Sequence, residues 1–238
     1  MRATGLAEIF PRALEIVEDV RLRGDEALLE LAERFDGARP ESLRVPREAI
    51  ERAKIEERTL AALRESIRAV RTFHEQQWPE GFRYSTYPGV EAERRFVPLD
   101  SVGVYVPGGL APLPSSLVMG AVPAQVAGVG RIAVATPKPD PTILATAREL
   151  GLDEVYCIGG AQAIAALAYG TETVERVDKI VGPGQSWTTA AKLLVSSVVG
   201  IDLPAGPSEV LIVADESADP EYCAVDLRAQ AEPGPCSA

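Results

Sequence analysis

The stretch VGVYVPGG at residues 102–109 is the first of a series of short apolar runs that lie next to glycine turns. Segments rich in alanine, with the composition of helices, separate these runs. Such alternation predicts parallel strands joined by crossover helices, the pattern of an α/β fold. The predicted strands are residues 102–106, 132–135, 155–158, 179–181 and 210–214, and the predicted helices between them are 115–127, 141–150, 162–168 and 186–199.

The glycine turns indicate what the sheet binds. They read PGG at 107–109, GG at 159–160, GPG at 182–184 and AGPS at 205–208. Loops at the carboxyl ends of parallel strands line the ligand crevice of such folds, and glycine allows backbone N–H groups to approach an anion closely. The stretch therefore predicts a site for a phosphorylated or dinucleotide-like ligand.

Composition limits the class of protein. The chain has 238 residues, of which 46% are hydrophobic, so one large or two modest domains with real cores are expected. Lys+Arg 24 against Asp+Glu 35 gives a net charge of -11, which argues against nucleic acid or an anionic membrane as a partner. The three cysteines lack metal-like spacing, no apolar signal core is present, and no run reaches the roughly 18 apolar residues of a spanning helix. A cytoplasmic protein is expected.

The flanking segments are mainly helical in pattern. Apolar periodicity predicts helices at 6–23 and 26–35 and one long helix from Pro46 to about Trp78. A hairpin is expected over 84–99 around the turn at 87–89, and a last helix over 219–232. The amino-terminal helices and the run at 210–214 have little sheet of their own to cover. Either they pack on the middle module, or part of a second domain is missing.

Longer motifs add a family resemblance that runs nearly from end to end. They are VRLRGDEA at 20–27, FDG at 35–37, FHEQQ at 73–77, VGVYVPGG at 102–109, GGAQAIAAL at 159–167, VDKIVGPG at 177–184, IDLPAGPSEVL at 201–211 and AQAE at 229–232. In this order they resemble the histidinol dehydrogenase family. The resemblance implies a zinc-dependent homodimeric enzyme of histidine biosynthesis that oxidises histidinol through histidinal to histidine with two molecules of NAD.

The resemblance also implies a discontinuous domain organisation within the aldehyde dehydrogenase-like superfamily. Residues 105–208 would form a Rossmann-like NAD-binding domain. This domain would be inserted in a second, incomplete Rossmann-like domain made of 1–104, with the amino-terminal helices and the hairpin, and of 209–238. The family's later strands and its small carboxyl-terminal domain, which helps to form the dimer, would be absent.

Site residues follow from the same motifs. Tyr105, Gln162 and Gln185 match positions at which the family contacts NAD, although the family usually has asparagine where Gln185 stands. Ser208 matches a substrate-binding serine, and Gln230 matches a glutamine that binds both zinc and substrate. Local chemistry alone also allows a buried phenol at Tyr105, a helix-start amide at Gln162 and a turn residue at Ser208.

The zinc site departs from the family pattern. The family reads Gln-Ala-Glu-His, whereas this chain has Pro233, which offers no side-chain donor atom. The family's other zinc ligands and its catalytic Glu-His pair would lie beyond residue 238. We therefore expect NAD as cofactor, an incomplete zinc site and no catalytic residue within the chain, so that the polypeptide does not turn over histidinol alone.

Other functions remain open at this point. The chain could be a non-catalytic nucleotide-binding fragment, or a relative that acts on another small alcohol. If the run at 210–214 has no covering partner, its apolar side chains should promote self-association.

Overall fold

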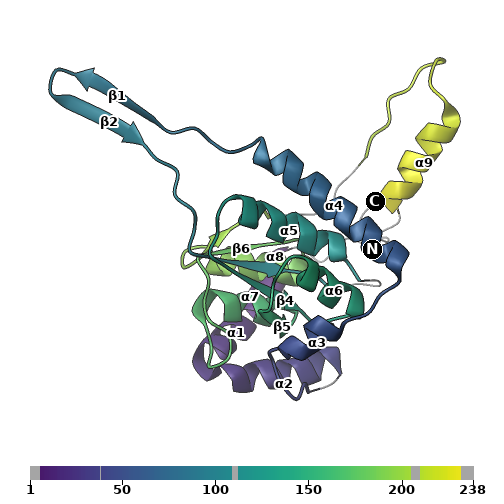
Figure 1. Ribbon diagram of the computed structural model, residues 1–238. Helices are drawn as coiled ribbons and strands as arrows, with labels where there is room; N and C mark the ends of the chain where they lie inside the picture. The colour runs from purple at the N-terminus through teal and green to yellow at the C-terminus, as the bar shows by residue number, and fades with distance from the viewer. Residues whose placement is uncertain (1–5, 38, 109–111, 205–209, 232–238) are drawn as a thin grey trace.

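The computed structural model describes residues 6–37, 39–108, 112–204 and 210–231. Within these ranges the chain forms a parallel sheet between two layers of helices (Figure 1). The helices are α1 (Leu6–Arg23), α2 (Asp25–Asp36), α3 (Arg47–Arg52), α4 (Glu57–Glu75), α5 (Pro114–Val126), α6 (Pro141–Glu149), α7 (Gly160–Tyr169), α8 (Ser186–Val195) and α9 (Pro220–Ala231). The strands are β1 (Phe82–Tyr87), β2 (Val90–Arg94), β3 (Ser101–Tyr105), β4 (Arg131–Thr136), β5 (Val155–Cys157), β6 (Lys179–Val181) and β7 (Gly200–Ile201).

The central sheet confirms the predicted parallel α/β arrangement. Its strand order is β5-β4-β3-β6-β7, and every neighbouring pair is parallel. The chain builds outward from β3 to β5 and then returns to start again at β6 on the other side of β3. The direction of winding therefore reverses between β3 and β6, which is where doubly wound sheets bind their ligands.

Successive side chains of β3 and β4 point to opposite faces of the sheet and so contribute to two separate hydrophobic cores. Val102, Val104 and Val134 face one side, where they pack with α5 and α6 and with residues of α3 and α4. Tyr105 and Ala135 face the other, where α7 and α8 lie under α1 and α2. Since α7 is enclosed between the sheet and α1, it is apolar on nearly all sides, with residues 161–168 buried. The helices α1 and α2 thus pack on the middle module.

The long helix predicted from Pro46 to Trp78 is wrong in one respect, because it is broken into α3 and α4. At the break, the Arg148 guanidinium donates to the carbonyl oxygen of Ala53 at 2.6 Å and of Glu51 at 3.4 Å. A side chain from α6 thus satisfies carbonyl groups that a continuous helix would have bonded internally. Apolar periodicity runs on through the break and gave no sign of it.

The strand predicted at 210–214 is also wrong. The described residues there form no strand, and Leu211 and Val213 are 87% and 89% exposed. The fifth strand of the sheet is instead β7, which pairs with β6 through Gly200 and Ile201. A strand needs a neighbour to satisfy its backbone groups, and residues 210–214 have the composition of a strand without a described neighbour.

The hairpin confirms the prediction of two strands around residues 87–89. The strands β1 and β2 are antiparallel, Tyr87 pairs with Val90, and Gly89 takes the positive φ of 80° that the turn requires. Every residue of both strands is exposed, and the hairpin projects from the main body in Figure 1. The helix α9 also stands apart there and has no buried residue.

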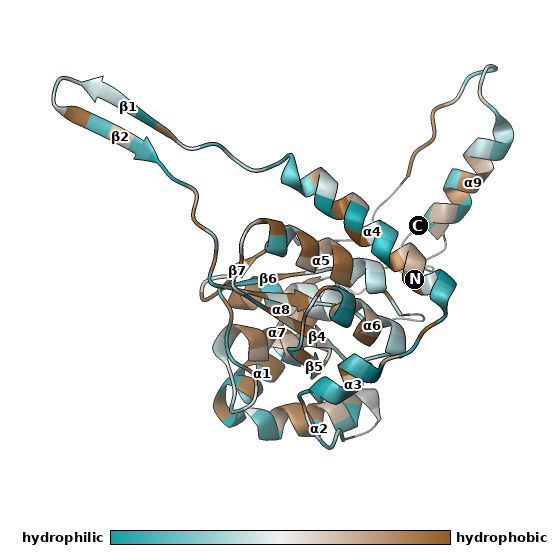
Figure 2. Cartoon of the chain, viewed as in Figure 1, coloured by the Kyte–Doolittle hydropathy of each residue, from teal (hydrophilic) through white to brown (hydrophobic). Residues whose placement is uncertain are grey.

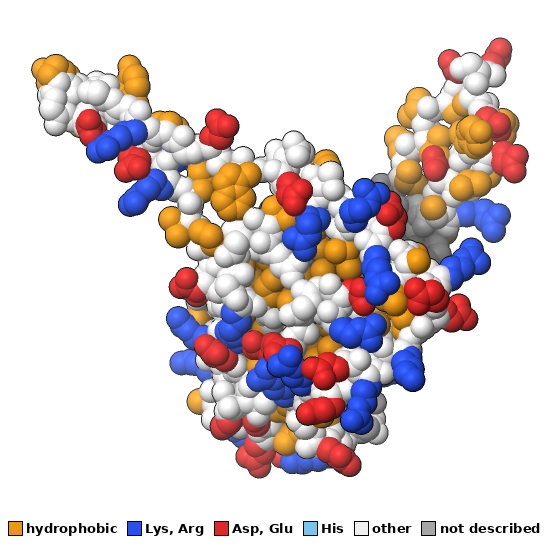
Figure 3. All heavy atoms as spheres, viewed as in Figure 1, with side chains coloured by type: hydrophobic (Ala, Val, Ile, Leu, Met, Phe, Trp, Pro, Cys, Tyr) orange, Lys and Arg blue, Asp and Glu red, His pale blue; other side chains and the backbone are white. Residues whose placement is uncertain are grey.

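The surface reflects this arrangement. In Figure 2, hydrophobic residues concentrate in α5 and the sheet, while α4 alternates between hydrophilic and hydrophobic residues. In Figure 3, hydrophobic side chains gather on α9 and at the tip of the hairpin, the two projecting parts of the molecule. None of the described helices has the length and apolar character needed to cross a bilayer.

Candidate functional site

A cavity of about 380 Å³ lies where the carboxyl ends of β3, β4, β5 and β6 meet. The loop after each of these strands contributes to its wall, and α1 and α2 close the outer side. The lining residues are Ile16, Phe35, Tyr105, Pro107, Gly108, Pro137, Gly160, Ala161, Gln162, Gln185, Trp187 and Thr188. The cavity therefore occupies the switch point of the sheet.

Tyr105 connects two of these loops. It is the last residue of β3, and its side chain is buried, with 4% exposure. The Tyr105 hydroxyl accepts a hydrogen bond from the backbone N–H of Gly160, the first residue of α7, at 3.1 Å. Tyr105 thus fixes the start of α7 relative to the centre of the sheet.

Gln162 lies in the first turn of α7 and is 3% exposed. Its amide folds back over Gly160, where a Cβ would meet the Gln162 Oε1 atom at 2.8 Å. Gly160 also has a φ of +59°, so a side chain there is disfavoured both by the backbone and by its neighbour. A carboxamide at the cavity wall offers both a donor and an acceptor to a ligand.

Gln185 lines the cavity from the loop after β6. It is exposed and immediately precedes α8, whose first N–H groups have no partner within the helix. Trp187 lines the same wall, and the Arg12 guanidinium of α1 lies 5.9 Å from its ring centroid. The starts of α7 and α8 therefore both lie at the cavity, and both present the positive ends of their dipoles to it.

Gly182 brings the loops after β3 and β6 into close contact. Its φ is +120°, and a Cβ there would lie 2.1 Å from the backbone oxygen of Tyr105. Asp202 accepts from the Gly182 N–H at 2.8 Å, and Lys192 donates to the Gly182 carbonyl. The sequence analysis did not select Lys192 or Asp202, although Lys192 is the one charged residue in the stretch 186–199 and was the available signal.

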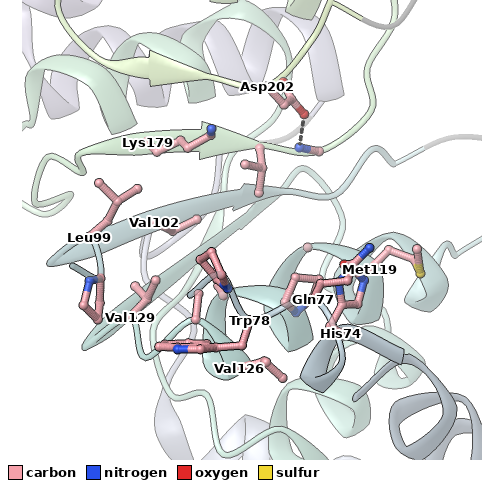
Figure 4. Close-up of a pocket in the computed structure, with 18 of the residues that line it drawn as sticks. His74, Gln77, Trp78, Leu99, Val102, Met119, Val126, Val129, Lys179 and Asp202 are labelled. Carbon is pink, nitrogen blue, oxygen red and sulfur yellow. Dashed lines mark hydrogen bonds between the residues drawn. The ribbon is translucent and has the colours of Figure 1, made fainter. Parts of the chain in front are cut away.

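A second hollow, which we call the apolar groove, has a volume of about 860 Å³. It runs between the end of α4, residues 96–99, α5 and β6, and Figure 4 shows Trp78, Val126 and Val129 along it with Lys179 and Asp202 at the far side. His74 lies here, and its ring packs edge-on against that of Phe73 at a centroid distance of 5.4 Å. Mostly apolar walls make the groove less suited to a dinucleotide than the smaller cavity.

Two carboxyl groups with a shifted pKa, Glu154 and Asp178, belong to polar clusters at the amino ends of the strands, away from the cavity. Arg131 donates to Glu154 at 2.8 Å, and Tyr156 donates to the same carboxylate at 2.8 Å. Burial raises the pKa of Glu154, but the hydrogen bonds from Arg131 and Tyr156 outweigh it, so the pKa is lowered overall. This is the behaviour of a structural ion pair.

The predicted site residues fall into two groups. Tyr105, Gln162 and Gln185 line one cavity, although they come from three separate loops. Gln230 lies on α9 and is not among the residues of that cavity. Ser208 and Pro233 lie outside the described residues.

The described residues do not by themselves fit a zinc ion. No group of three or more His, Cys, Asp or Glu side chains within the described ranges is placed to hold a metal. Gln230 supplies a single amide oxygen, which is one donor of the four that a zinc site needs.

Comparisons with known proteins agree on one family. A family model described as histidinol dehydrogenase matches residues 2–238. The histidinol dehydrogenase of Photobacterium profundum is 48% identical over 237 residues, and that of Methanothermobacter thermautotrophicus is 50% identical over 239; each match covers 97% of this chain and 54% or 56% of the relative. The crystal structure of histidinol dehydrogenase from Elizabethkingia anophelis superposes with a TM-score of 0.88 at 39% identity, covering 98% of this chain and 55% of that one. The chain thus spans about half the length of the relatives it matches.

Proposed function

The chain belongs to the histidinol dehydrogenase family, and from this premise we propose that its cavity binds NAD for the oxidation of L-histidinol to L-histidine. The observation that carries the proposal is the convergence of Tyr105, Gln162 and Gln185. The first and last of them are 80 positions apart along the chain, and the fold brings all three to one cavity at the switch point of the sheet.

The chain's own groups would hold the cofactor in distinct ways. The first N–H groups of α8, and those of α7 that follow Gly160, are suited to the pyrophosphate, because they have no partner within the helix and lie at positive dipole ends; the Gly160 N–H itself donates to Tyr105. Gln162 and Gln185 offer amide donors and acceptors from two different loops. Tyr105, Phe35 and Trp187 supply apolar surface that excludes water. When bound, NAD supplies the hydride acceptor of the reaction.

Substrate and metal contacts are part of the same proposal. Ser208 is assigned to the substrate, and Gln230 to both substrate and zinc, on the strength of the motifs GPSE and AQAE. Pro233 stands where the family has a zinc-binding histidine, so the metal would lose that ligand outright. The polypeptide by itself is therefore proposed not to turn over histidinol.

The domain arrangement is proposed along the same lines. Residues 105–208 would be the NAD-binding domain, and 1–104 with 209–238 would belong to a second Rossmann-like domain of the aldehyde dehydrogenase-like superfamily. In favour of the first unit, four of the five strands of the parallel sheet, β4 to β7, lie within 105–208, and β3 ends at Tyr105, its first residue. A cytoplasmic location is proposed, as for other enzymes of amino-acid biosynthesis.

Calorimetric titration of the purified chain with NAD tests the proposal. We expect saturable binding and a melting temperature that rises with NAD concentration, since a ligand of the folded state stabilises it by mass action. Gln162→Leu removes the cavity amide at similar volume and should weaken binding. Gln125→Leu is the matched control, because Gln125 bonds to Arg71 and Leu150 on α4 and α6 rather than at the cavity. Absence of heat and of a melting shift at millimolar NAD would refute the proposal.

A non-catalytic nucleotide-binding module is the second candidate, favoured by Pro233. Assays of reduced-cofactor absorbance with histidinol and zinc test the absence of turnover that both candidates share, because a signal would refute the second candidate and the proposed inactivity of the polypeptide by itself. A panel of other small amino alcohols in the same assay tests whether the chain is a dehydrogenase with a different substrate.

A further inference from the structure

Lys192 is a buried cation in the layer of helices that covers one face of the sheet. It lies on α8 with 4% of its residue surface exposed. Its Nζ atom lies 2.6 Å from the Asp202 Oδ1 atom, and the Lys192 side chain is only 5% exposed. Among the ion pairs of the described residues, this one has the most buried cation.

The pair holds one residue, Gly182, through both of its backbone groups. Lys192 donates to the carbonyl oxygen of Gly182, and the other Asp202 oxygen, Oδ2, accepts from the Gly182 N–H at 2.8 Å. Figure 4 marks the bond from Asp202 with a dashed line at the end of β6. Both backbone groups of Gly182 are thereby used, so its orientation is fixed in two directions.

Gly182 lines the apolar groove rather than the cavity, but it packs directly against the backbone of Tyr105, which lines the cavity. The space between Gly182 and the Tyr105 backbone is too small for any side chain. Residues 183 and 184 connect Gly182 directly to Gln185 and the start of α8. A rotation about the backbone of Gly182 would move the loop that carries Gln185 and would release the contact of Gly182 with the end of β3.

A buried ion pair of this kind is weak evidence for stability. The desolvation of two charges roughly cancels their attraction, and well-packed apolar residues often replace such pairs without loss. What an apolar pair cannot do is donate to one backbone group and accept from the other. Lysine suits the task because it is a compact charge with three donors.

We infer that Lys192, through its pair with Asp202, is a positioning residue for the dinucleotide cavity, which it serves by fixing Gly182 and the loop 182–185. The inference rests on the proposed binding of NAD. Lys192 does not line the cavity, so its effect on a ligand would pass through the loop.

The test compares two double substitutions. We call Lys192 and Asp202 the clamp, since together they hold Gly182. Lys192→Met with Asp202→Ala removes the clamp without leaving one buried charge unpaired. Arg131→Met with Glu154→Ala is the matched control, because that pair is also partly buried, at 22% and 14% side-chain exposure, but lies at the amino ends of the strands. Hydrogen exchange over residues 182–185, calorimetric titration with NAD and the melting temperature are measured for both variants and for the wild type.

We expect the clamp variant to exchange faster over 182–185 and to bind NAD about tenfold more weakly or worse, the effect of losing a positioned charged hydrogen bond. The control should lose thermal stability but keep wild-type exchange over 182–185 and wild-type affinity. If the clamp variant does not fold, Asp202→Asn serves instead, since one amide oxygen replaces two carboxylate oxygens; it should show the same changes to a smaller degree.

Unchanged exchange over 182–185, or unchanged NAD affinity in a folded clamp variant, overturns the inference. Equal weakening in the control also overturns it, because the effect would then be general destabilisation. A wild-type chain that does not bind NAD is a different result, which defeats the proposed function itself.

Discussion

The hydroxyl of Tyr105 accepts a hydrogen bond from the backbone N–H of Gly160 at 3.1 Å and so joins the end of β3 to the start of α7. The two residues are 55 positions apart in sequence. One phenol thereby sets the spacing between two loops that line the proposed NAD cavity. Tyr105 contributes a hydroxyl that holds the start of α7 and a ring that fills the core. A substitution that removes only the hydroxyl separates these two contributions.

Tyr105→Phe should lower the free energy of unfolding by about 1 kcal/mol, the usual net value of one hydrogen bond. The ring remains, so the core stays filled, and NAD affinity should fall only a few-fold. Urea denaturation and calorimetry measure the two effects. Tyr222→Phe, which removes a hydroxyl from a residue that is 73% exposed, controls for the chemical change. Equal stability of the two variants would contradict the prediction.

Gly182→Ala should be far more disruptive than an ordinary glycine substitution. The new Cβ would meet the Tyr105 backbone oxygen at 2.1 Å, and the φ of +120° is unfavourable for alanine. We expect the free energy of unfolding to fall by roughly 2–4 kcal/mol. NAD binding should be lost as well. Gly151→Ala is the control, since Gly151 has a φ of +70° but nothing within 4 Å of a Cβ. It should cost only about 1 kcal/mol. Similar losses at both positions would show that the contact with Tyr105 is unimportant.

The carboxyl of Asp178 should make stability depend on pH in the acid range. The Ser101 hydroxyl, at 2.7 Å, and the Ser101 N–H, at 2.9 Å, both donate to it and lower its pKa from the usual 3.8. The stabilisation is complete above the unfolded pKa and is lost as the pH falls through the lowered folded value. As the pH is lowered, the urea concentration at the midpoint of unfolding should therefore fall less steeply for Asp178→Asn than for the wild type. Asp226→Asn on α9 should keep the wild-type slope; parallel slopes in all three proteins would count against the prediction.

Leu211 and Val213 should promote self-association, because both are almost fully exposed at 87% and 89%. Replacing both with serine should reduce the concentration dependence of the sedimentation coefficient and leave the melting temperature unchanged. Serine at Val17 and Leu28, which are buried against α7, would instead unfold the protein and serves as a contrast. A wild-type chain that sediments as a monomer at all concentrations would contradict this expectation.

Local pattern was enough to predict the parallel sheet, because the strands from 102 to 181 are short apolar runs separated by helical segments, and three of them end in a glycine turn. It was enough to place Tyr105 and Gln162 at strand ends, where parallel strands gather their loops. It failed at 210–214, since strand composition says nothing about the availability of a neighbour, and at the break near Ala53, which depends on Arg148 from another helix. The Lys192 clamp was missed for the same reason, because its meaning lies in contacts with residues 182 and 202.

The seam between β3 and β6 has a kinetic consequence. Ser101 and Asp178, which bond across it, are 77 residues apart, so a long chain segment must be ordered before this pair can form. The β3-α5-β4-α6-β5 unit and the β6-α8-β7 unit each rest on more local contacts and are expected to condense earlier. The proposed NAD cavity would then be completed only when these two units dock. A nucleotide that binds there would stabilise the docked form of the chain.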